Sequence, residues 1–365
     1  MKLKLVLFSS LLLLTMSCTR TQQFSEAGES VIDFSSQKEI SLDDFIAEVK
    51  YIPMEVTTES SIMEATQVIA DERCFYIYDA YSSSVKCFSW NGKFLKQLGR
   101  NGQGPGEYSR ISSVCADESN IYVLDYKNKI IVFDKQNLSF TKEYNNVFGS
   151  TFCKTSFGWV FMDFRDDYSV KVFDNTFNPL YQAVPNVVKS GYVEWPSYRF
   201  YNTDSLSYIF PPHYNQIYCI TQDSCILQKT ISYGKYQTIP NEVYQEKSDH
   251  NSMNDIYEDE THVQYCRHVD GSDFFITSFR VGKKAFLGVN CKTDNSTYYI
   301  STNTEEKGKN CFVFSPDCSY KDYFVSVQNL SSLQSQEYCI RDKRFQQMSD
   351  TISKESDVIV LWKIK

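Results

Sequence analysis

Four glycines and a proline stand together in the segment GRNGQGPGEY, residues 99–108, of a chain with only 14 glycines and 9 prolines. A P-loop has a lysine directly after its last glycine, but Pro105 follows Gly104 here. A dinucleotide-binding loop continues from GxGxxG into a helix, and Pro105 with Gly106 interrupts that pattern. We therefore expect a sharp backbone turn between two strands, because glycine tolerates positive φ and proline fixes its own.

The other residues capable of chemistry form no recognised catalytic or metal-binding motif. The 12 cysteines and 4 histidines include no CxxC pair, no zinc spacing and no HExxH, and no serine lies in a GxSxG setting. Cys219 with Cys225, or Cys311 with Cys318, could form disulfides across hairpins. We prefer the simpler interpretation that they are small buried side chains, and we expect no cofactor and no bound metal.

Three aspartates, Asp79, Asp125 and Asp163, each end a run of apolar residues and recur at a spacing of roughly 40 residues. Such residues could be metal ligands. Aspartate at the end of a strand, however, commonly accepts hydrogen bonds from the backbone amides of its own turn. We therefore expect all three to have a structural role.

The repeat that contains these aspartates predicts the fold. Its clearest unit is NIYVLDYKNKIIVFD, two strand-like runs around a polar turn, and a spacing near 40 residues is typical of propeller blades with four strands each. Weaker copies follow, and the last of six blades lacks one strand. The spare N-terminal run at residues 48–57 would complete it beside the C-terminal strand. We predict an all-β, six-bladed β-propeller closed by this pairing.

The chain ends and two interruptions complete the predicted organisation. Residues 1–17 have the positive and apolar regions of a secretory signal, with an apolar run too short to span a bilayer. Residues 18–38 are expected to be a polar tether, and residues 39–365 the propeller. Within the propeller we expect a long surface insertion at residues 238–261 and an amphipathic helix in blade six at about residues 333–350.

The signal ends in LTMSC, which resembles a bacterial lipobox. The resemblance implies cleavage before Cys18 and attachment of lipid to that cysteine. A soluble secreted protein cut nearby and an uncleaved anchor are the alternatives.

The units IYVLDYKNKIIVFD and YIYDAYSSSVKCF resemble the NHL-type repeat. With NGKFLKQLGRNGQGPGEY, VKYIPMEVTTES and the terminal DVIVLWKIK, they are similar to a family of bacterial six-bladed β-propeller lipoproteins. The likeness covers nearly the whole mature chain and is most specific in the first two blades and the glycine loop. The family is largely uncharacterised, so the resemblance implies a fold and a location in the cell envelope, at the outer membrane, and no catalytic residue.

Candidate binding residues follow from the topology of a blade. In four antiparallel strands, the turn between strands two and three emerges on the same face as the connection to the next blade, and loops on a rigid scaffold commonly bind ligands. Aromatic rings and arginine there would suit sugars or acidic groups, although a single aromatic is more often packed between blades. The candidates on this face are Arg100, Glu107, Tyr108, Arg110, Trp195, Tyr198, Arg199 and His213.

These features lead us to expect a lipid-anchored envelope protein that acts as a binding or interaction module for a carbohydrate, a peptide or an envelope protein. The formal net charge of −8 and the dispersed lysines and arginines argue against nucleic acid. The alternative is a metal-dependent hydrolase or lyase that acts on a sugar or lactone at the central channel. A purely structural part of an envelope complex is a third interpretation, and the sequence leaves periplasmic and surface orientations open.

Overall fold

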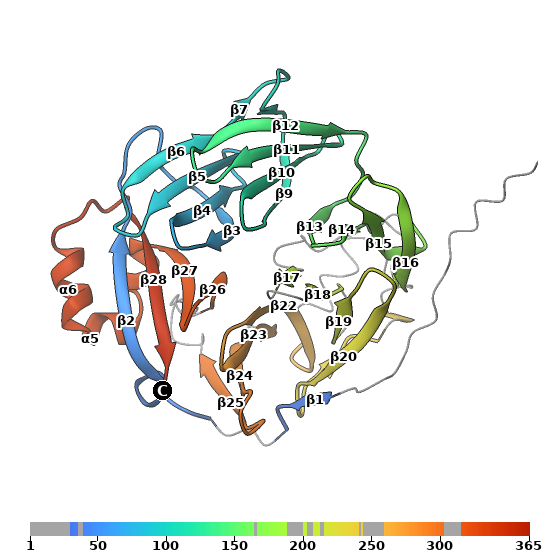
Figure 1. Cartoon of the computed structure of the whole chain (residues 1–365). Helices are drawn as coiled ribbons and strands as arrows, with labels where there is room; N and C mark the ends of the chain where they lie inside the picture. The colour runs from blue at the N-terminus through green and yellow to red at the C-terminus, as the bar shows by residue number, and fades with distance from the viewer. Residues whose placement is uncertain are drawn as a thin grey trace, which may run out of the picture.

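The computed structural model is a ring of six β-sheets around a common axis, and each sheet is one blade (Figure 1). It describes residues 30–35, 39–163, 166–187, 200–202, 207–211, 215–240, 242–243, 259–282, 284–302 and 315–365. The predicted signal peptide and Cys18 lie outside these residues. No helix in the described ranges is long and apolar enough to cross a membrane.

The first three blades each consist of four consecutive antiparallel strands. Their middle strands are buried on both faces because the neighbouring blades cover them, which explains their nearly continuous apolar sequences. Blade 1 contains β3 (Ala65–Ala70), β4 (Cys74–Asp79), β5 (Ser84–Ser89) and β6 (Phe94–Leu98); blade 2 contains β9 (Ile111–Ala116), β10 (Asn120–Asp125), β11 (Lys129–Asp134) and β12 (Ser139–Asn145); blade 3 contains β13 (Thr151–Lys154), β14 (Gly158–Met162), β15 (Tyr168–Asp174) and β16 (Pro179–Pro185).

The last three blades are less regular, because segments from elsewhere in the chain join them. Blade 4 contains β17 (Phe200–Asn202), β18 (Ser207–Ile209), β19 (Gln216–Ile220) and β20 (Cys225–Ser232); blade 5 contains β22 (His262–Asp270), β23 (Phe274–Val281), β24 (Lys284–Cys291) and β25 (Thr297–Thr302), with the short β21 (Gln237–Thr238) beside β22; blade 6 contains β26 (Cys318–Tyr320), β27 (Tyr323–Asn329), β28 (Asp357–Ile364) and β2 (Ile46–Pro53).

Strand β2 closes the ring. It pairs antiparallel with β28, in a register that runs from Ile46 opposite Ile364 to Pro53 opposite Val358. Blade 6 is therefore built from both ends of the chain, and the predicted six-bladed propeller and its closure are confirmed. The pairing covers the edge of β28 and joins two distant parts of the chain in one blade.

An N-terminal segment that precedes β2 is also part of the propeller. Strand β1 (Ser30–Asp33) pairs parallel with the outer edge of β20, and Glu39 forms a bridge with Tyr299 of β25. Ile32 and Phe34 are only 2% and 1% exposed. We call residues 30–35 and 39–45, which end in the short helix α1 (Leu42–Phe45), the N-terminal strap. The tether expected over residues 18–38 is therefore wrong for residues 30–35, which belong to the folded ring.

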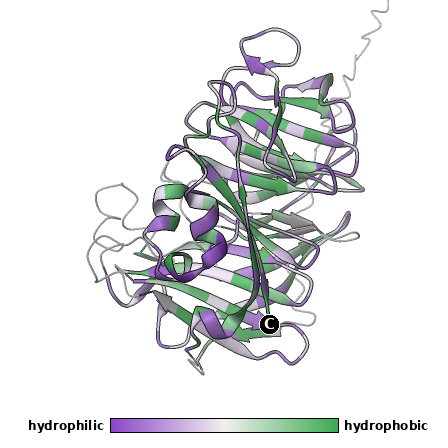
Figure 2. Ribbon diagram, turned by 90° about the vertical axis from the view of Figure 1, so that its left-hand side faces the viewer, coloured by the Kyte–Doolittle hydropathy of each residue, from purple (hydrophilic) through white to green (hydrophobic). Residues whose placement is uncertain are grey.

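The expected helix of blade six is three short helices. They are α4 (Leu330–Gln334), α5 (Glu337–Arg341) and α6 (Lys343–Ser349), inserted between β27 and β28. Asp342 ends α5 and also begins α6, where its carboxylate accepts a hydrogen bond from the Arg344 amide, so the helix axis changes direction there. Figure 2 shows the helices against the side of the ring. Most of the insertion expected at residues 238–261 lies outside the described residues.

Candidate functional site

The glycine loop forms a small structure of its own between blades 1 and 2. Strands β7 (Arg100–Asn101) and β8 (Glu107–Tyr108) pair in parallel, and the loop projects beyond β12 at the edge of the ring (Figures 1 and 2). The amide of Gly102 donates to the Tyr108 carbonyl at 2.9 Å, and the amide of Glu107 donates to the Gly104 carbonyl at 3.0 Å. The loop is thus a tightly bonded turn, as expected.

The carboxylate of Glu107 occupies the place where a phosphate-binding loop would hold its ligand. Its Oε2 accepts a hydrogen bond from the Gly104 amide at 2.8 Å, and its Oε1 accepts one from Arg100 Nε at 2.6 Å. The Gly104 amide and the Arg100 guanidinium together lower the pKa of the Glu107 carboxyl. The loop therefore neutralises an anion of its own, and no phosphate is needed to satisfy it.

Glycine is required at two positions of this loop by both conformation and space. Gly99 and Gly106 have φ of +67° and +74°. A Cβ atom on Gly106 would lie 2.8 Å from Cγ of Phe140, a residue of β12. The loop is consequently packed onto the outer part of blade 2, and its position is fixed.

The candidate residues from the sequence have different environments. Tyr108 is buried and its hydroxyl donates to the Leu98 carbonyl at 2.9 Å, so it is a core residue and not the surface contact that we expected. Glu107 is likewise engaged inside its loop. Arg100 and Arg110 lie at the surface, and Arg110 is 5.9 Å from the ring centre of Tyr126. The remaining candidates lie outside the described residues: Trp195, Tyr198, Arg199 and His213.

The repeated aspartates organise the upper face, which we define as the face with the turns between the second and third strands of each blade. Asp79 accepts hydrogen bonds from the amides of Met63, Glu64 and Tyr81, each at 3.1 Å. In each of the first two blades, an aspartate thus ties the incoming connection to the turn that follows the second strand. The predicted structural role is confirmed for Asp79 and, as described next, for Asp125.

Asp125 repeats the arrangement in blade 2. It accepts hydrogen bonds from the amides of Ser109 at 3.0 Å, Arg110 at 3.2 Å and Lys127 at 3.3 Å. Both carboxylates are almost completely buried, so these amides replace the water that the charge would otherwise need. Asp163 of blade 3 is also buried and lies 3.7 Å from Lys171 Nζ.

Large apolar side chains extend from these bonded turns into solvent. Met63, Tyr81, Tyr126 and Phe148 are 66%, 74%, 70% and 56% exposed, and all four lie on upper-face turns or connections. We call these residues and Arg110 the aromatic rim. Only Arg110 was a candidate from the sequence. An available signal was the aromatic residue that follows the repeated aspartate, at Tyr81 and at Tyr126.

Hydrogen bonds between neighbouring turns fix the backbone segments that carry the rim relative to one another. The amide of Ile111 donates to Ser83 Oγ at 2.8 Å, which joins the turn of blade 1 to the entry of blade 2. The amide of Val147 donates to the Asn128 carbonyl at 2.9 Å, which joins the turn of blade 2 to the connection that carries Phe148. The rim is therefore held in place before any ligand arrives.

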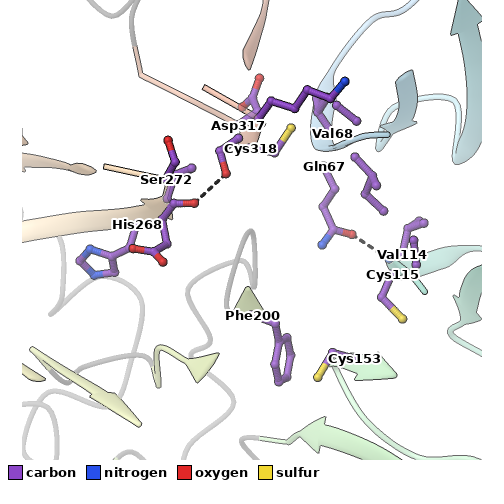
Figure 3. Close-up of a pocket in the computed structure, with 18 of the residues that line it drawn as sticks. Gln67, Val68, Val114, Cys115, Cys153, Phe200, His268, Ser272, Asp317 and Cys318 are labelled. Atoms are coloured by element: carbon purple, nitrogen blue, oxygen red, sulfur yellow. Dashed lines mark hydrogen bonds between the residues drawn. The ribbon is translucent and has the colours of Figure 1, made fainter. Parts of the chain in front are cut away.

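A separate cavity of about 740 Å³ lies in the central channel (Figure 3). The inner strands of all six blades line it, and the Gln67 side chain crosses between blades to accept a hydrogen bond from the Val114 amide at 2.8 Å. Across the described part of the chain, no group of three His, Cys, Asp or Glu side chains could hold a metal ion. The metal-dependent alternative therefore has no ligand set among these residues.

The ten cysteines within the described ranges are free thiols, and seven of them are buried. Cys219 and Cys225 are two of the buried ones, and in the β19–β20 hairpin Cys219 lies opposite Ile226 while Cys225 lies opposite Ile220. Burial raises the pKa of both thiols. They pack as small apolar side chains, and Cys311 lies outside the described residues.

Comparison with known proteins identifies relatives of the fold. A "Putative exported protein" from Bacteroides fragilis NCTC 9343 has a solved structure with a TM-score of 0.82 and 19% identity, over 92% of this chain and 100% of that one. A member of the DUF4221 family from Bacteroides vulgatus ATCC 8482 has a TM-score of 0.58 and 10% identity, over 88% of this chain and 98% of that one. No curated protein matches. The family described as "Domain of unknown function (DUF4934)" matches residues 29–362, and the chain belongs to this family.

Proposed function

We propose that this protein is an exported binding module that holds a protein partner against the aromatic rim. The observation that carries the proposal is the exposure of Met63, Tyr81, Tyr126 and Phe148 on one face of two adjacent blades. Leaving such side chains in water is unfavourable, and an exposed apolar surface of this kind is typical of an interaction site.

The composition of the rim favours a protein over a carbohydrate. Tyrosine, phenylalanine, methionine and arginine are the residues enriched at the centres of protein interfaces. Arg110, which lies over Tyr126, adds a cation whose apolar stem can pack while its head pairs with an acidic group. A sugar would need several polar groups beside each ring, whereas Met63 and Phe148 offer none.

The proposed location is the cell envelope, with the propeller tethered through a lipid on Cys18. The signal-like residues 1–17 and the lipobox-like LTMSC support export and anchoring. The description of the similar Bacteroides fragilis protein as exported is in agreement. Labelling with a radioactive fatty acid tests the anchor: the wild-type chain should take up label and Cys18→Ala should not.

Photo-crosslinking in living cells tests the rim. A photoreactive amino acid replaces Tyr126 in the full-length protein, and ultraviolet light should then produce an adduct of discrete mass. Tyr81→Ser and Phe148→Ser should each reduce the yield of this adduct at least fivefold, because they remove apolar contact area from the same surface.

Two controls separate binding from folding. Leu95 lies on the outer strand β6 and is also exposed, so Leu95→Ser should leave the adduct unchanged. All variants should retain the wild-type melting temperature within about 2 °C, because surface substitutions cost little. An adduct that persists at full yield in both rim variants would overturn the proposal.

A further inference from the structure

The central cavity has walls of two chemical kinds. Half-buried apolar side chains from blades 1, 2 and 4 line one side: Ile69, Ala116 and Phe200. Polar groups from blades 5 and 6 line the other side, and Ser319 there donates its hydroxyl hydrogen to the Asp270 carbonyl at 2.6 Å. A space with one apolar wall and one polar wall suits a ligand that also has both parts.

The polar part of the cavity lies at the lower face, opposite the aromatic rim. Ser272 follows β22 and Lys321 follows β26, so both stand in turns between the first and second strands of their blades. Both are exposed, and they flank the mouth of the cavity. A ligand that enters here would pass these two residues and reach the apolar wall.

Lys321 differs from the neighbouring lysines in its charge partners. Lys292 Nζ is 2.8 Å from Asp270, and Lys363 Nζ is 3.1 Å from Asp322. Lys321 forms no ion pair with a carboxylate of the described ranges, and its ammonium group instead lies 5.1 Å from the ring centre of Tyr320. The mouth therefore has one positive charge that no described carboxylate balances.

The backbone at Lys321 gives a second observation. The residue has a φ of +51° in the two-residue turn between Tyr320 and Tyr323, a conformation that glycine and asparagine adopt more easily than lysine. Asn128 and Asn295 occupy positive-φ positions in the turns of blades 2 and 5. The turn thus places a lysine side chain at the cavity mouth in a backbone conformation that does not favour lysine.

We propose that the central cavity binds a small amphiphilic carboxylate, with its head at Lys321 and Ser272 and its apolar body against Ile69, Ala116 and Phe200. One unbalanced ammonium group matches one carboxylate, whereas a phosphate monoester would bring about two charges at neutral pH. A volume of about 740 Å³ lies in the usual range of pockets for small ligands. This site is independent of the aromatic rim.

Calorimetric titration of the mature protein with octanoate, octan-1-ol and acetate tests the proposal. Octanoate should bind more tightly than either other probe, because only octanoate has both the charge and the apolar body. Lys321→Asn should weaken octanoate binding at least tenfold and leave octan-1-ol binding unchanged. The same variant should melt at the wild-type temperature or above it, because asparagine accepts the positive φ more easily.

Two further variants complete the experiment. Ala116→Leu enlarges a side chain of the apolar wall and should weaken the binding of octanoate and of octan-1-ol alike. Lys363→Asn should weaken the binding of neither probe. Absence of octanoate binding to the wild-type protein would overturn the proposal. An octanoate affinity of Lys321→Asn equal to that of the wild-type protein would also overturn the proposal. The photo-crosslinking adduct at Tyr126 is expected to be unaffected by Lys321→Asn, so the two proposals can fail separately.

Discussion

Blades 1 and 2 hold their turns with a buried aspartate, whereas blades 4 and 5 are covered at their outer edges by a segment from the other end of the sequence. The amide of Met63 is 16 residues from its partner Asp79. The Ser30 hydroxyl, in contrast, donates to the Gln228 carbonyl 198 residues away. One architecture is thus stabilised by local contacts in one half of the ring and by a distant segment in the other.

The comparison shows why the repeat is clear in one half of the sequence and faint in the other. A buried aspartate that receives several amides must be kept in each blade that uses it, so it leaves a periodic pattern. The N-terminal strap supplies main-chain hydrogen bonds and buried apolar side chains, among them Ile32 and Phe34, which require no pattern in the blades that it covers. Loss of the repeat toward the C-terminus therefore accompanies a different means of stabilisation and leaves the fold intact.

The largest expected effect comes from the strap. Phe34→Ala should lower the free energy of unfolding by about 3–5 kcal/mol, because it empties a buried aromatic site beside Tyr299, whose ring centre is 5.1 Å away. Urea denaturation measures this change. Val31→Ala on the same strand is the control, with an expected change below about 0.5 kcal/mol because Val31 is exposed.

Hydrogen exchange in the Phe34→Ala protein sharpens the comparison. Amides of β20 should lose protection while amides of β10 keep theirs, because the strap pairs with β20 and touches no strand of blade 2 in the described pairing. Uniform loss of protection around the ring would show that the two halves are not independently stabilised.

The next effect concerns the aspartate of blade 2. Asp125→Ala should lower the free energy of unfolding by about 2–3 kcal/mol, because it leaves the amides of Ser109, Arg110 and Lys127 without their acceptor. Asp134→Ala removes a similar carboxylate from an exposed turn, where water can replace it, and should cost less than about 1 kcal/mol. The same denaturation assay compares the two, and equal losses would contradict the importance of burial.

A smaller effect is expected in the glycine loop. Gly106→Ala should lower the free energy of unfolding by about 1–2 kcal/mol, because alanine at positive φ is strained and its methyl group would meet Phe140. Gln103→Ala in the same loop meets neither problem and is the control. A thermal melt of both variants would reveal whether the loop is as tightly packed as described.

The smallest effect concerns the junction of blades 6 and 1 and depends on pH. Burial and the nearby Asp79 carboxylate raise the pKa of Asp357 from 3.8 to about 6. Between these pH values the folded chain keeps the proton that the unfolded chain releases, so stability falls as pH rises through this window. Asp357→Asn should therefore raise the free energy of unfolding by about 1 kcal/mol at pH 8.

At pH 4 the advantage of Asp357→Asn should vanish, because Asp357 is then protonated in the folded protein. Melting temperatures between pH 4 and pH 8 test the trend. An equal gain in melting temperature at pH 4 and at pH 8 would show that the stabilisation does not come from removing the Asp357 charge.

The sequence was sufficient to predict the ring of blades and insufficient to predict the N-terminal strap and the three helices of blade 6. Periodic aspartates and apolar runs predicted the blades, and the spare strand at residues 48–57 predicted the closure, because both are repeated or unmatched features of the chain. The strap was missed because Ile32 and Phe34, its buried side chains in residues 30–35, are two apolar positions within a polar stretch. The helices of blade 6 were expected as one, because apolar spacing does not reveal that Asp342 can cap a new helix.

The candidate site was located less well than the fold. The blade topology indicated the upper face as the candidate surface. Choosing among its residues required knowledge of which side chains are buried or already hydrogen-bonded within the protein. Tyr108 and Glu107 looked available in the sequence, and both are engaged by their own loop. Tyr81 and Tyr126 looked like ordinary turn residues until their exposure was known.

The pairing of β2 with β28 also constrains how the molecule can be made. A ribosome produces β2 before the strands of blades 1 to 5 and β28 after them, so β2 remains without its partner while most of the propeller is made. Until β28 has been made, β2 is an unpaired strand with open hydrogen-bonding groups, the kind of edge that leads to aggregation. Deletion of β28 would leave that edge open, so the eight residues Asp357–Ile364 determine whether the ring closes or remains an aggregation-prone intermediate.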